Sequence, residues 1–90
     1  MVRYRSGTDI TTQILEAALE PSTQTAIMFR SYAAHRQVIY YLSPLLQDGL
    51  IDYMAGEKKY KSKQEGIKFL EVYEQIEALA GLMATAVLSE

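Results

Sequence analysis

Apolar residues near the start of the chain recur every three or four positions, which is the spacing of one face of an α-helix. The residues that form this pattern are Ile10, Ile14, Leu15, Ala18 and Leu19. Thr8 or Asp9, both common helix caps, precedes the first of them, and Pro21 follows the last. The pattern therefore predicts a first helix that begins at Thr8 or Asp9 and that Pro21 ends.

Two further helices are predicted in close succession. Ser22 or Thr23 can cap a second helix, and a short turn leads into a third helix that begins near His35. The third helix is expected to bury an apolar side made of Val38, Ile39, Leu42, Leu45 and Leu46. Pro44 lacks an amide hydrogen, so we expect a break or kink near Ser43.

A hairpin is predicted after Gly49, a residue type that often follows a helix C-terminus. Residues 50–54 are predicted to form one strand, residues 55–57 the turn, and residues 59–63 the return strand, with Tyr60 as its apolar member. Four lysines lie in or beside the return strand: Lys58, Lys59, Lys61 and Lys63. Two strands alone are marginally stable, so the hairpin must pack against the helices.

Residues 64–88 have the pattern of one long helix, with weak spots at Gly66 and Gly81. Its apolar residues alternate between spacings of three and four, as the a and d positions of a coiled coil do. These positions, called the apolar stripe below, are Phe69, Val72, Ile76, Leu79, Met83 and Ala86. A helix of this length extends about 37 Å, further than three short helices can cover. We therefore expect a homodimer held by a coiled coil.

This order of elements is that of a winged helix-turn-helix, a mainly α (α+β) fold class. Residues 1–63 would form the head with its wing hairpin, and residues 64–90 the dimerisation helix of the same structural domain. In such a fold the third helix enters the major groove of DNA and the hairpin lies along the backbone. Arg36, Gln37 and Tyr40 are predicted to occupy the open face of the third helix.

The residue types on and near this helix suit two kinds of DNA contact. Arginine, as at Arg36, can donate two hydrogen bonds to guanine, and glutamine, as at Gln37, can pair with adenine. Phosphates need positive charge but no particular geometry, and the residues expected to contact them are Arg30, Lys58, Lys59 and Lys61. A solvated helix face, or lysines that protect an edge strand, would give the same pattern.

Composition excludes several classes of protein. With 90 residues, 49% of them hydrophobic and none of them cysteine, the chain fits one small globular domain without disulfides or thiolate metal sites. The single histidine, His35, cannot form a metal site alone, and no catalytic motif is present, so we expect no enzyme activity, cofactor or small-molecule substrate.

Residues 78–88, the longest uncharged apolar stretch, are far shorter than the roughly 20 residues of a membrane span. Without a signal peptide at the N-terminus, a cytoplasmic, nucleoid-associated protein is expected.

The formal net charge of −2 conceals a polarised molecule. Residues 1–63 carry eight basic and six acidic residues, whereas residues 64–90 carry one basic and five acidic residues. The row of Glu71, Glu74 and Glu77 would repel DNA, which fits a long helix that points away from the duplex.

The motifs and their spacing also resemble those of the archaeal winged-helix DNA-binding proteins that dimerise through a C-terminal antiparallel coiled coil. The resemblance spans residues 6 to about 77 and rests on SGTDITTQILEAAL, TAIMFRSYAAHRQVIYYL, LLQDGLID and KYKSKQEGIKFLEVYEQI. It implies a dimeric regulator or chromatin protein that binds double-stranded DNA. The residues that it places at the start of the recognition helix and on the wing are His35, Arg36, Gln37, Lys58, Lys59 and Lys61.

Departures from the family pattern favour a selective regulator over a DNA-coating protein. Lys63 stands where the family has a small hydroxyl residue as N-cap, so Ser62 would cap the last helix or its end would fray. Pro44 is unusual in the third helix, and the chain is less basic than an abundant chromatin protein. An alternative stays open, because the same fold can serve as a protein-interaction module within a larger transcription or replication assembly. Also open is whether Arg3 and Arg5 form an arm that reaches a minor groove.

Overall fold

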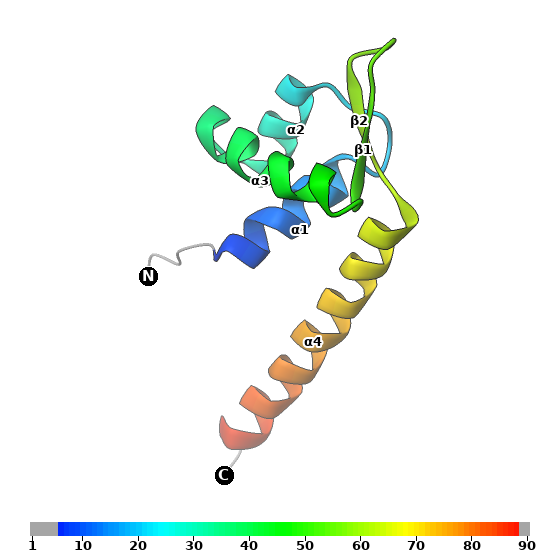
Figure 1. Cartoon of the computed structure of the whole chain (residues 1–90). Coiled ribbons are helices and arrows are strands. Elements are labelled where there is room, and N and C mark those ends of the chain that lie inside the picture. Colours follow the sequence, from blue (N-terminus) through cyan, green and yellow to red (C-terminus); the bar gives the residue numbers. More distant parts are fainter. Residues whose placement is uncertain (1–5, 89–90) are drawn as a thin grey trace.

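Three short helices, a hairpin and one long helix follow one another along the chain (Figure 1). The computed structural model describes the backbone of residues 6–88 and the side chains of residues 6–82. The elements are α1 (Gly7–Ala17), α2 (Gln24–Ser31), α3 (His35–Gln47), β1 (Ile51–Met54), β2 (Lys59–Ser62) and α4 (Gln64–Leu88). The predicted fold class, a mainly helical winged helix-turn-helix with a long last helix, is confirmed.

The start of α1 lies before the predicted one. Ser6, rather than Thr8 or Asp9, is the N-cap. The Ser6 hydroxyl accepts the backbone N–H of Asp9 at 3.1 Å, and the Asp9 carboxylate accepts the backbone N–H of Ser6 at 3.0 Å. These reciprocal bonds form a capping box, which places Asp9 in the third position of the helix.

α1 ends shortly before Pro21, as predicted. α1 ends at Ala17, and the carbonyl of the next residue, Ala18, accepts the backbone N–H of Ser62 at 2.7 Å. Pro21 cannot continue the helix, because its ring would clash with the carbonyl four residues earlier, which belongs to Ala17. Leu19, predicted on the buried face of the helix, lies beyond its end and is 45% exposed.

The second and third helices begin where they are predicted. Thr23 is the N-cap of α2, and its hydroxyl accepts the backbone N–H of Ala26 at 3.2 Å. Tyr32 ends α2 in the left-handed conformation, with φ of 55°. α3 then begins at His35.

No break occurs at Ser43, because α3 is continuous through Pro44. Proline removes the hydrogen bond that its amide would donate to the carbonyl four residues earlier, which belongs to Tyr40. Tyr40 lies on the exposed side of the helix, where water can replace that bond. The next turn is intact, since the backbone N–H of Asp48 donates to the carbonyl of Pro44 at 2.9 Å.

One hydrophobic core joins all the elements of the head, which comprises α1, α2, α3 and the hairpin. Its largest fully buried apolar side chains are Ile14, Leu15, Ile27, Val38 and Ile51. α3 contributes Val38, Leu42 and Leu45 as predicted. Ile39 and Leu46 were also expected in the core, but they are 49% and 38% exposed because they lie on the flank of α3.

The hairpin follows a Schellman motif at the end of α3. Gly49 has φ of 75°, and its backbone N–H donates to the carbonyl of Leu46. The backbone N–H of Leu50 donates to the carbonyl of Leu45. β1 and β2 then pair antiparallel, with Ile51 opposite Ser62.

β2 is held on its other side as well. Ser22 and Tyr60 exchange two backbone hydrogen bonds, at 2.9 and 2.7 Å. The Ser62 hydroxyl donates to the carbonyl of Leu15 at 2.7 Å instead of capping the last helix, which was one of the two alternatives expected for that end. Because β2 bonds to both β1 and the segment before α2, the wing is fastened to the helices.

α4 packs against the head only along its first turns. Leu70 is buried in the core, and Phe69 packs against it. Gly66, predicted as a weak spot, lies against the residue that precedes β1: a Cβ there would overlap the carbonyl oxygen of Leu50 and lie 3.0 Å from Leu15. Gly66 thus permits the close packing of helix and head.

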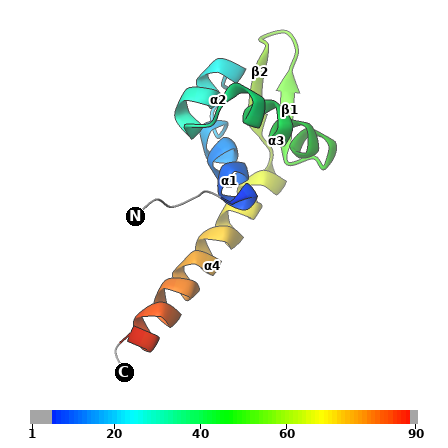
Figure 2. The same ribbon diagram turned by 90° about the vertical axis from the view of Figure 1, so that its left-hand side faces the viewer.

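Beyond these turns α4 continues away from the head (Figure 2). The molecule measures 56 Å along its longest axis, against 28 and 19 Å across. Among the described residues no helix is long and apolar enough to span a bilayer.

Candidate nucleic-acid interface

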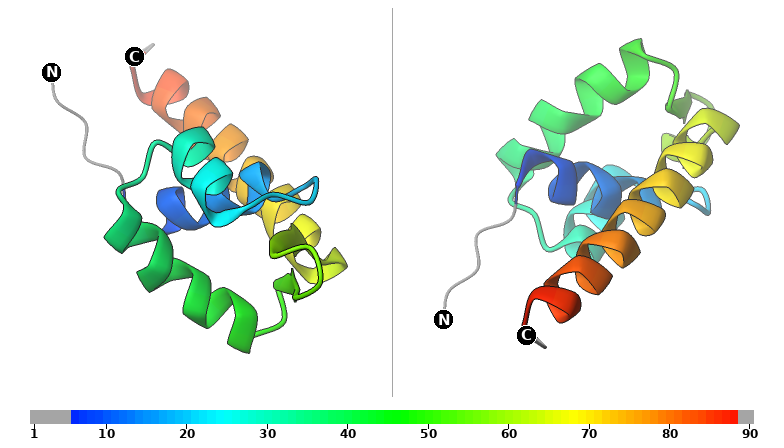
Figure 3. Two further views of the ribbon diagram at one scale, coloured as in Figure 1. Left: turned by 90° about the horizontal axis from the view of Figure 1, so that it is seen from above. Right: turned by 90° about the horizontal axis from the view of Figure 1, so that it is seen from below.

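α3 runs along one edge of the head, seen from above and from below (Figure 3). Arg36, Tyr40, Ser43 and Gln47 follow one another at spacings of four, three and four, and all are exposed. They lie opposite the buried side of the helix. Arg36 and Tyr40 were predicted on this face; Ser43 and Gln47 were not, because a break or kink was expected near Ser43.

Two adjacent tyrosines of α3 differ in their exposure to solvent, because successive residues of a helix point in different directions. Tyr40 is 71% exposed, whereas Tyr41 is half-buried and packs against the core. Their rings meet edge to face, with centroids 5.1 Å apart. Tyr40 is thus the member of the pair that a DNA backbone could reach.

Hydrogen bonds at the start of α3 already engage two of the predicted residues. The Nε2 atoms of His35 and Gln24 are 3.2 Å apart. The amide oxygen of Gln37 accepts the backbone N–H of Ala34 at 3.0 Å. That oxygen is the acceptor that a bidentate contact with adenine would need, so Gln37 in this conformation has only its NH₂ group to offer.

Arg30 is exposed, but it also has a structural role. One guanidinium nitrogen, Nη1, donates to the Ser22 hydroxyl at 2.9 Å and to the carbonyl of Ala17 at 3.3 Å. These contacts join the last turn of α2 to the end of α1. The other guanidinium nitrogens of Arg30 can still meet a phosphate.

The wing lysines share the side of the hairpin opposite its tyrosines. Side chains alternate along a strand, and the buried pair Ile51 and Ser62 marks the inner side. The pairs on the outer side are Asp52 with Lys61 and Met54 with Lys59. Lys58 lies at the turn, with φ of 54°. The three predicted lysines therefore cover the outer side and the tip of the wing.

Tyr53 and Tyr60 pair on the inner side of the wing, next to the helices. Their ring centroids are 4.8 Å apart. Burial raises the pKa of Tyr60, and the neighbouring Tyr53 raises it further. The Tyr60 hydroxyl is therefore neutral at physiological pH.

A hollow of about 330 Å³ lies between α3, the start of α2 and the wing. Four apolar or aromatic side chains and three polar ones line it: Ile39, Leu42, Leu46, Tyr60, Gln24, Ser43 and Gln47. The hollow continues the outward face of α3 toward the hairpin. Together they form a surface of aliphatic, amide and hydroxyl groups with Arg36 at one end.

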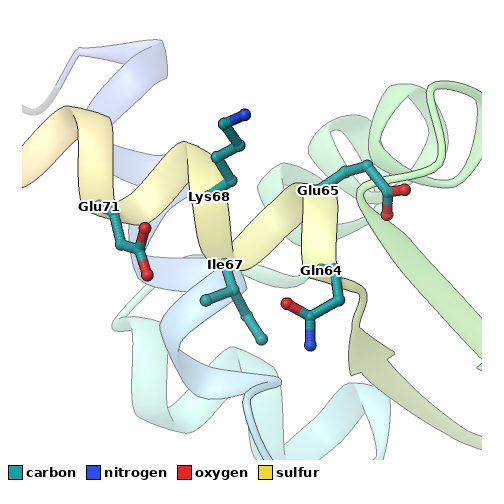
Figure 4. Close-up of a pocket in the computed structure, with 5 residues that line it drawn as sticks. All are labelled: Gln64, Glu65, Ile67, Lys68 and Glu71. Carbon is teal, nitrogen blue, oxygen red and sulfur yellow. The ribbon is translucent and has the colours of Figure 1, made fainter.

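A second hollow, of about 420 Å³, lies on the first turns of α4 (Figure 4). Its lining comes from α4 alone, and Lys68 points away from Ile67 rather than into a common centre. Glu65 and Glu71 lie a turn or more apart. Within the described residues no three histidine or acidic side chains are close enough together to hold a metal ion.

A tyrosine joins α4 to the start of α1. The Tyr73 hydroxyl lies within hydrogen-bond distance of the carboxylate of Asp9 and, at 2.9 Å, of Glu77. These two bonds hold the phenolic proton, so they raise the pKa of Tyr73 well above its ordinary value.

The apolar stripe of α4 is exposed beyond the head. Phe69 is half-buried against the core, but Val72, Ile76 and Leu79 are 46%, 58% and 61% exposed. Leu82, which was not predicted to belong to the stripe, is 67% exposed beside it. The side chains of Met83 and Ala86 lie outside the described residues, as do Arg3 and Arg5.

Comparison with known proteins identifies a family and a similar solved structure. The family model described as winged helix-turn-helix matches residues 4–81. The fold is similar to the crystal structure of Sso10a-2, a DNA-binding protein from Sulfolobus solfataricus, with a TM-score of 0.84 and 15% sequence identity. That likeness covers 94% of this chain and 92% of the other. No curated protein matches the chain in sequence.

Proposed function

Because the chain belongs to the winged helix-turn-helix family, we propose that it is a dimeric, sequence-selective protein that binds double-stranded DNA and regulates transcription. The observation that carries the proposal is the outward face of α3, an exposed helix of 13 residues that holds Arg36 and no acidic residue. Such a helix can enter the major groove without repelling the phosphates on either side. The description of Sso10a-2 as a DNA-binding protein is in keeping with this.

The division of contacts follows from where the side chains lie. Arg36 is exposed in the first turn of α3, where it can donate two hydrogen bonds to guanine. Gln37 beside it contacts a base only through its NH₂ group unless its capping bond opens, while His35 and Tyr40 approach the backbone. The residues proposed to contact phosphates are Arg30, Lys58, Lys59 and Lys61.

Dimerisation is proposed through the apolar stripe of α4. Val72, Ile76 and Leu79 lie on a helix that has left the head, so no other element of the described chain covers them. A second α4 would bury this stripe from Phe69 to Ala86 in a coiled coil. The two heads would then be held apart, and each could meet its own half-site on the duplex.

Charge favours selective binding over coating of DNA. The head region has an excess of two positive charges and the α4 region an excess of four negative charges. Attraction to DNA is thus confined to the head, and a weak general attraction leaves room for base contacts to decide where the protein binds. We place the protein at the nucleoid, acting at promoters by occlusion or recruitment.

A second candidate function is a protein-interaction module. The observation in its favour is that Phe29 and Tyr32, at the end of α2, are 70% and 85% exposed. Exposed aromatic side chains are common in protein interfaces. In that case the wing lysines would serve only to keep the surface soluble.

Fluorescence anisotropy separates the two functions. A labelled random duplex and a fragment from upstream of the gene are each titrated with protein at two salt concentrations. A DNA-binding protein releases counterions, so its affinity must fall steeply with salt, and the upstream fragment should bind more tightly. A variant with Lys58, Lys59 and Lys61 changed to Ala should show a shallower salt dependence. Folded protein that binds neither duplex would favour the protein-interaction module.

A further inference from the structure

The flank of α3 that faces the wing is apolar although it is exposed. Ile39 is 49% exposed and Leu46 is 38% exposed, one on each side of Ser43. Leu42, between them in the sequence, belongs to the core. Two aliphatic side chains are thus left on the very helix that the proposed function inserts into the major groove.

Amide groups border the same aliphatic surface. Gln47 and Gln24 line the hollow together with Ile39 and Leu46, and Tyr60 of the wing closes it. Ile39, Ser43 and Gln47 are each four residues apart, so they form one row along α3. The row is about 12 Å long at 1.5 Å per residue, which is more than one base pair can occupy.

In the major groove this chemistry matches one kind of base pair. The C5-methyl group of thymine is the characteristic apolar group there, and adenine presents the N6 donor and N7 acceptor that a glutamine amide can pair with. Reading cytosine requires an acceptor for its N4 hydrogens, typically a carboxylate, and α3 has no acidic residue.

We propose that α3 prefers a run of A·T base pairs, with Ile39 against a thymine methyl group and Gln47 on an adenine further along the run. The inference rests on the proposed function, since it names the class of sequence that the DNA-binding helix selects. Arg36, one turn before Ile39, then contacts a guanine or a phosphate at the edge of the run. Leu46 and Tyr60 form the apolar wall on the wing side.

A substitution in the DNA tests the methyl contact directly. Alternating dA-dT duplexes are compared with alternating dA-dU duplexes, which lack only the thymine methyl groups, by anisotropy at one salt concentration. The protein should bind the dA-dT duplex more tightly, by about fourfold for each methyl group that it buries. The Ile39→Ala variant should bind the two duplexes equally.

Leu19→Ala is the matched control, because Leu19 is 45% exposed and lies outside the hollow that Ile39 lines. It should keep the preference for dA-dT over dA-dU. Gln47→Ala should lower the preference for dA-dT over alternating dG-dC duplexes by at least about fivefold. Circular dichroism establishes that each variant is folded.

The possible outcomes separate the inference from the function on which it rests. If no duplex binds, the proposed function fails. If all duplexes bind and the wild-type protein does not distinguish dA-dT from dA-dU, or if Ile39→Ala still distinguishes them, the methyl contact is overturned while DNA binding stands. Tighter binding to dG-dC than to dA-dT would overturn the A·T preference as a whole.

Discussion

Arg30 and Arg36 show how differently two exposed arginines of the head are held. Arg30 bonds to Ser22 and to the end of α1, whereas Arg36 extends from the first turn of α3. The same residue type thus fastens two helices in one place and is available to DNA in the other. Replacing each of them should affect different properties of the protein.

Arg36→Ala should weaken binding to a preferred DNA site by about 1–3 kcal/mol and have little effect on random DNA. The reason is that a bidentate contact with guanine is lost while the phosphate contacts remain. Anisotropy titrations with both duplexes measure the two losses. Lys68→Ala on α4 serves as a control that leaves both affinities unchanged, and an equal loss on both duplexes would refute base reading by Arg36.

Tyr73→Phe should make the protein less sensitive to alkaline pH. The folded state raises the pKa of Tyr73 above the ordinary value of about 10, so the stability due to its hydroxyl is present below that pH and is lost as the pH rises beyond it. From pH 8 to pH 11 the melting temperature should therefore fall further for the wild-type protein than for this variant. Tyr40→Phe, which removes an exposed hydroxyl, should behave like the wild type; equal falls in all three proteins would contradict the role of Tyr73.

Helical periodicity alone was sufficient to predict that Arg36 and Tyr40 are exposed. Ser43 and Gln47 were missed because a proline inside a helix usually interrupts it, and here the missing hydrogen bond falls on the solvated side. The capping role of Gln37 was hidden as well. Its partner at the helix start is Ala34, which has no hydroxyl, so the usual capping-box signature is absent.

At the scale of elements, the two glycines of α4 have opposite surroundings. Gly66 lies against the carbonyl of Leu50, whereas a Cβ at Gly81 would meet nothing within 4 Å. Both were predicted as weak spots from helix propensity alone. Helix propensity alone describes the effect of Gly81 on α4. At Gly66 the close packing against Leu50 has a larger effect than helix propensity.

Gly66→Ala should lower the free energy of unfolding by about 1–3 kcal/mol, because the added methyl group forces α4 away from Leu50 and Leu15. Gly81→Ala should raise it by about 0.5–1 kcal/mol, because alanine favours the helix and nothing obstructs it. Urea denaturation at a fixed protein concentration measures both changes. A stabilised Gly66→Ala variant would show that α4 does not pack as described.

Elements were predicted more accurately than their ends. Local spacing of apolar residues determines where a helix forms, and α4 has its predicted bounds. The start of α1, in contrast, was expected at Thr8 or Asp9, whereas Ser6 is its N-cap. Several residues with capping side chains lie close together there, and the spacing of apolar residues does not choose between them.

At the scale of the whole molecule, a small head carries a helix that extends well beyond it. The length of α4 and the spacing of its apolar residues could be predicted from the sequence, and so could the separation of charge between head and helix. The hollow between α3 and the wing could not be predicted from the sequence, because it depends on how the hairpin packs against α1 and α2. Ile39 and Leu46 were therefore expected to be buried.

Ile76→Glu should convert the proposed dimer into a monomer, because Ile76 is 58% exposed in the middle of the apolar stripe and a charge there would be buried at the interface. Sedimentation equilibrium at micromolar concentration measures the mass, and circular dichroism the helix content. Gln75→Glu adds the same charge beside the stripe and should leave the dimer intact. A wild-type protein that sediments as a monomer would refute the coiled coil.

The contact of Ser62 and Leu70 with α1 also bears on how the protein is made. Leu70 completes the core, and Ser62 bonds to Leu15 and Ala18, 47 and 44 positions earlier in the chain. While a ribosome is still adding these residues, α1, α2 and α3 have emerged without the groups that close their core. The core of the head can therefore close completely only after Ser62 and the first turns of α4 have been synthesised.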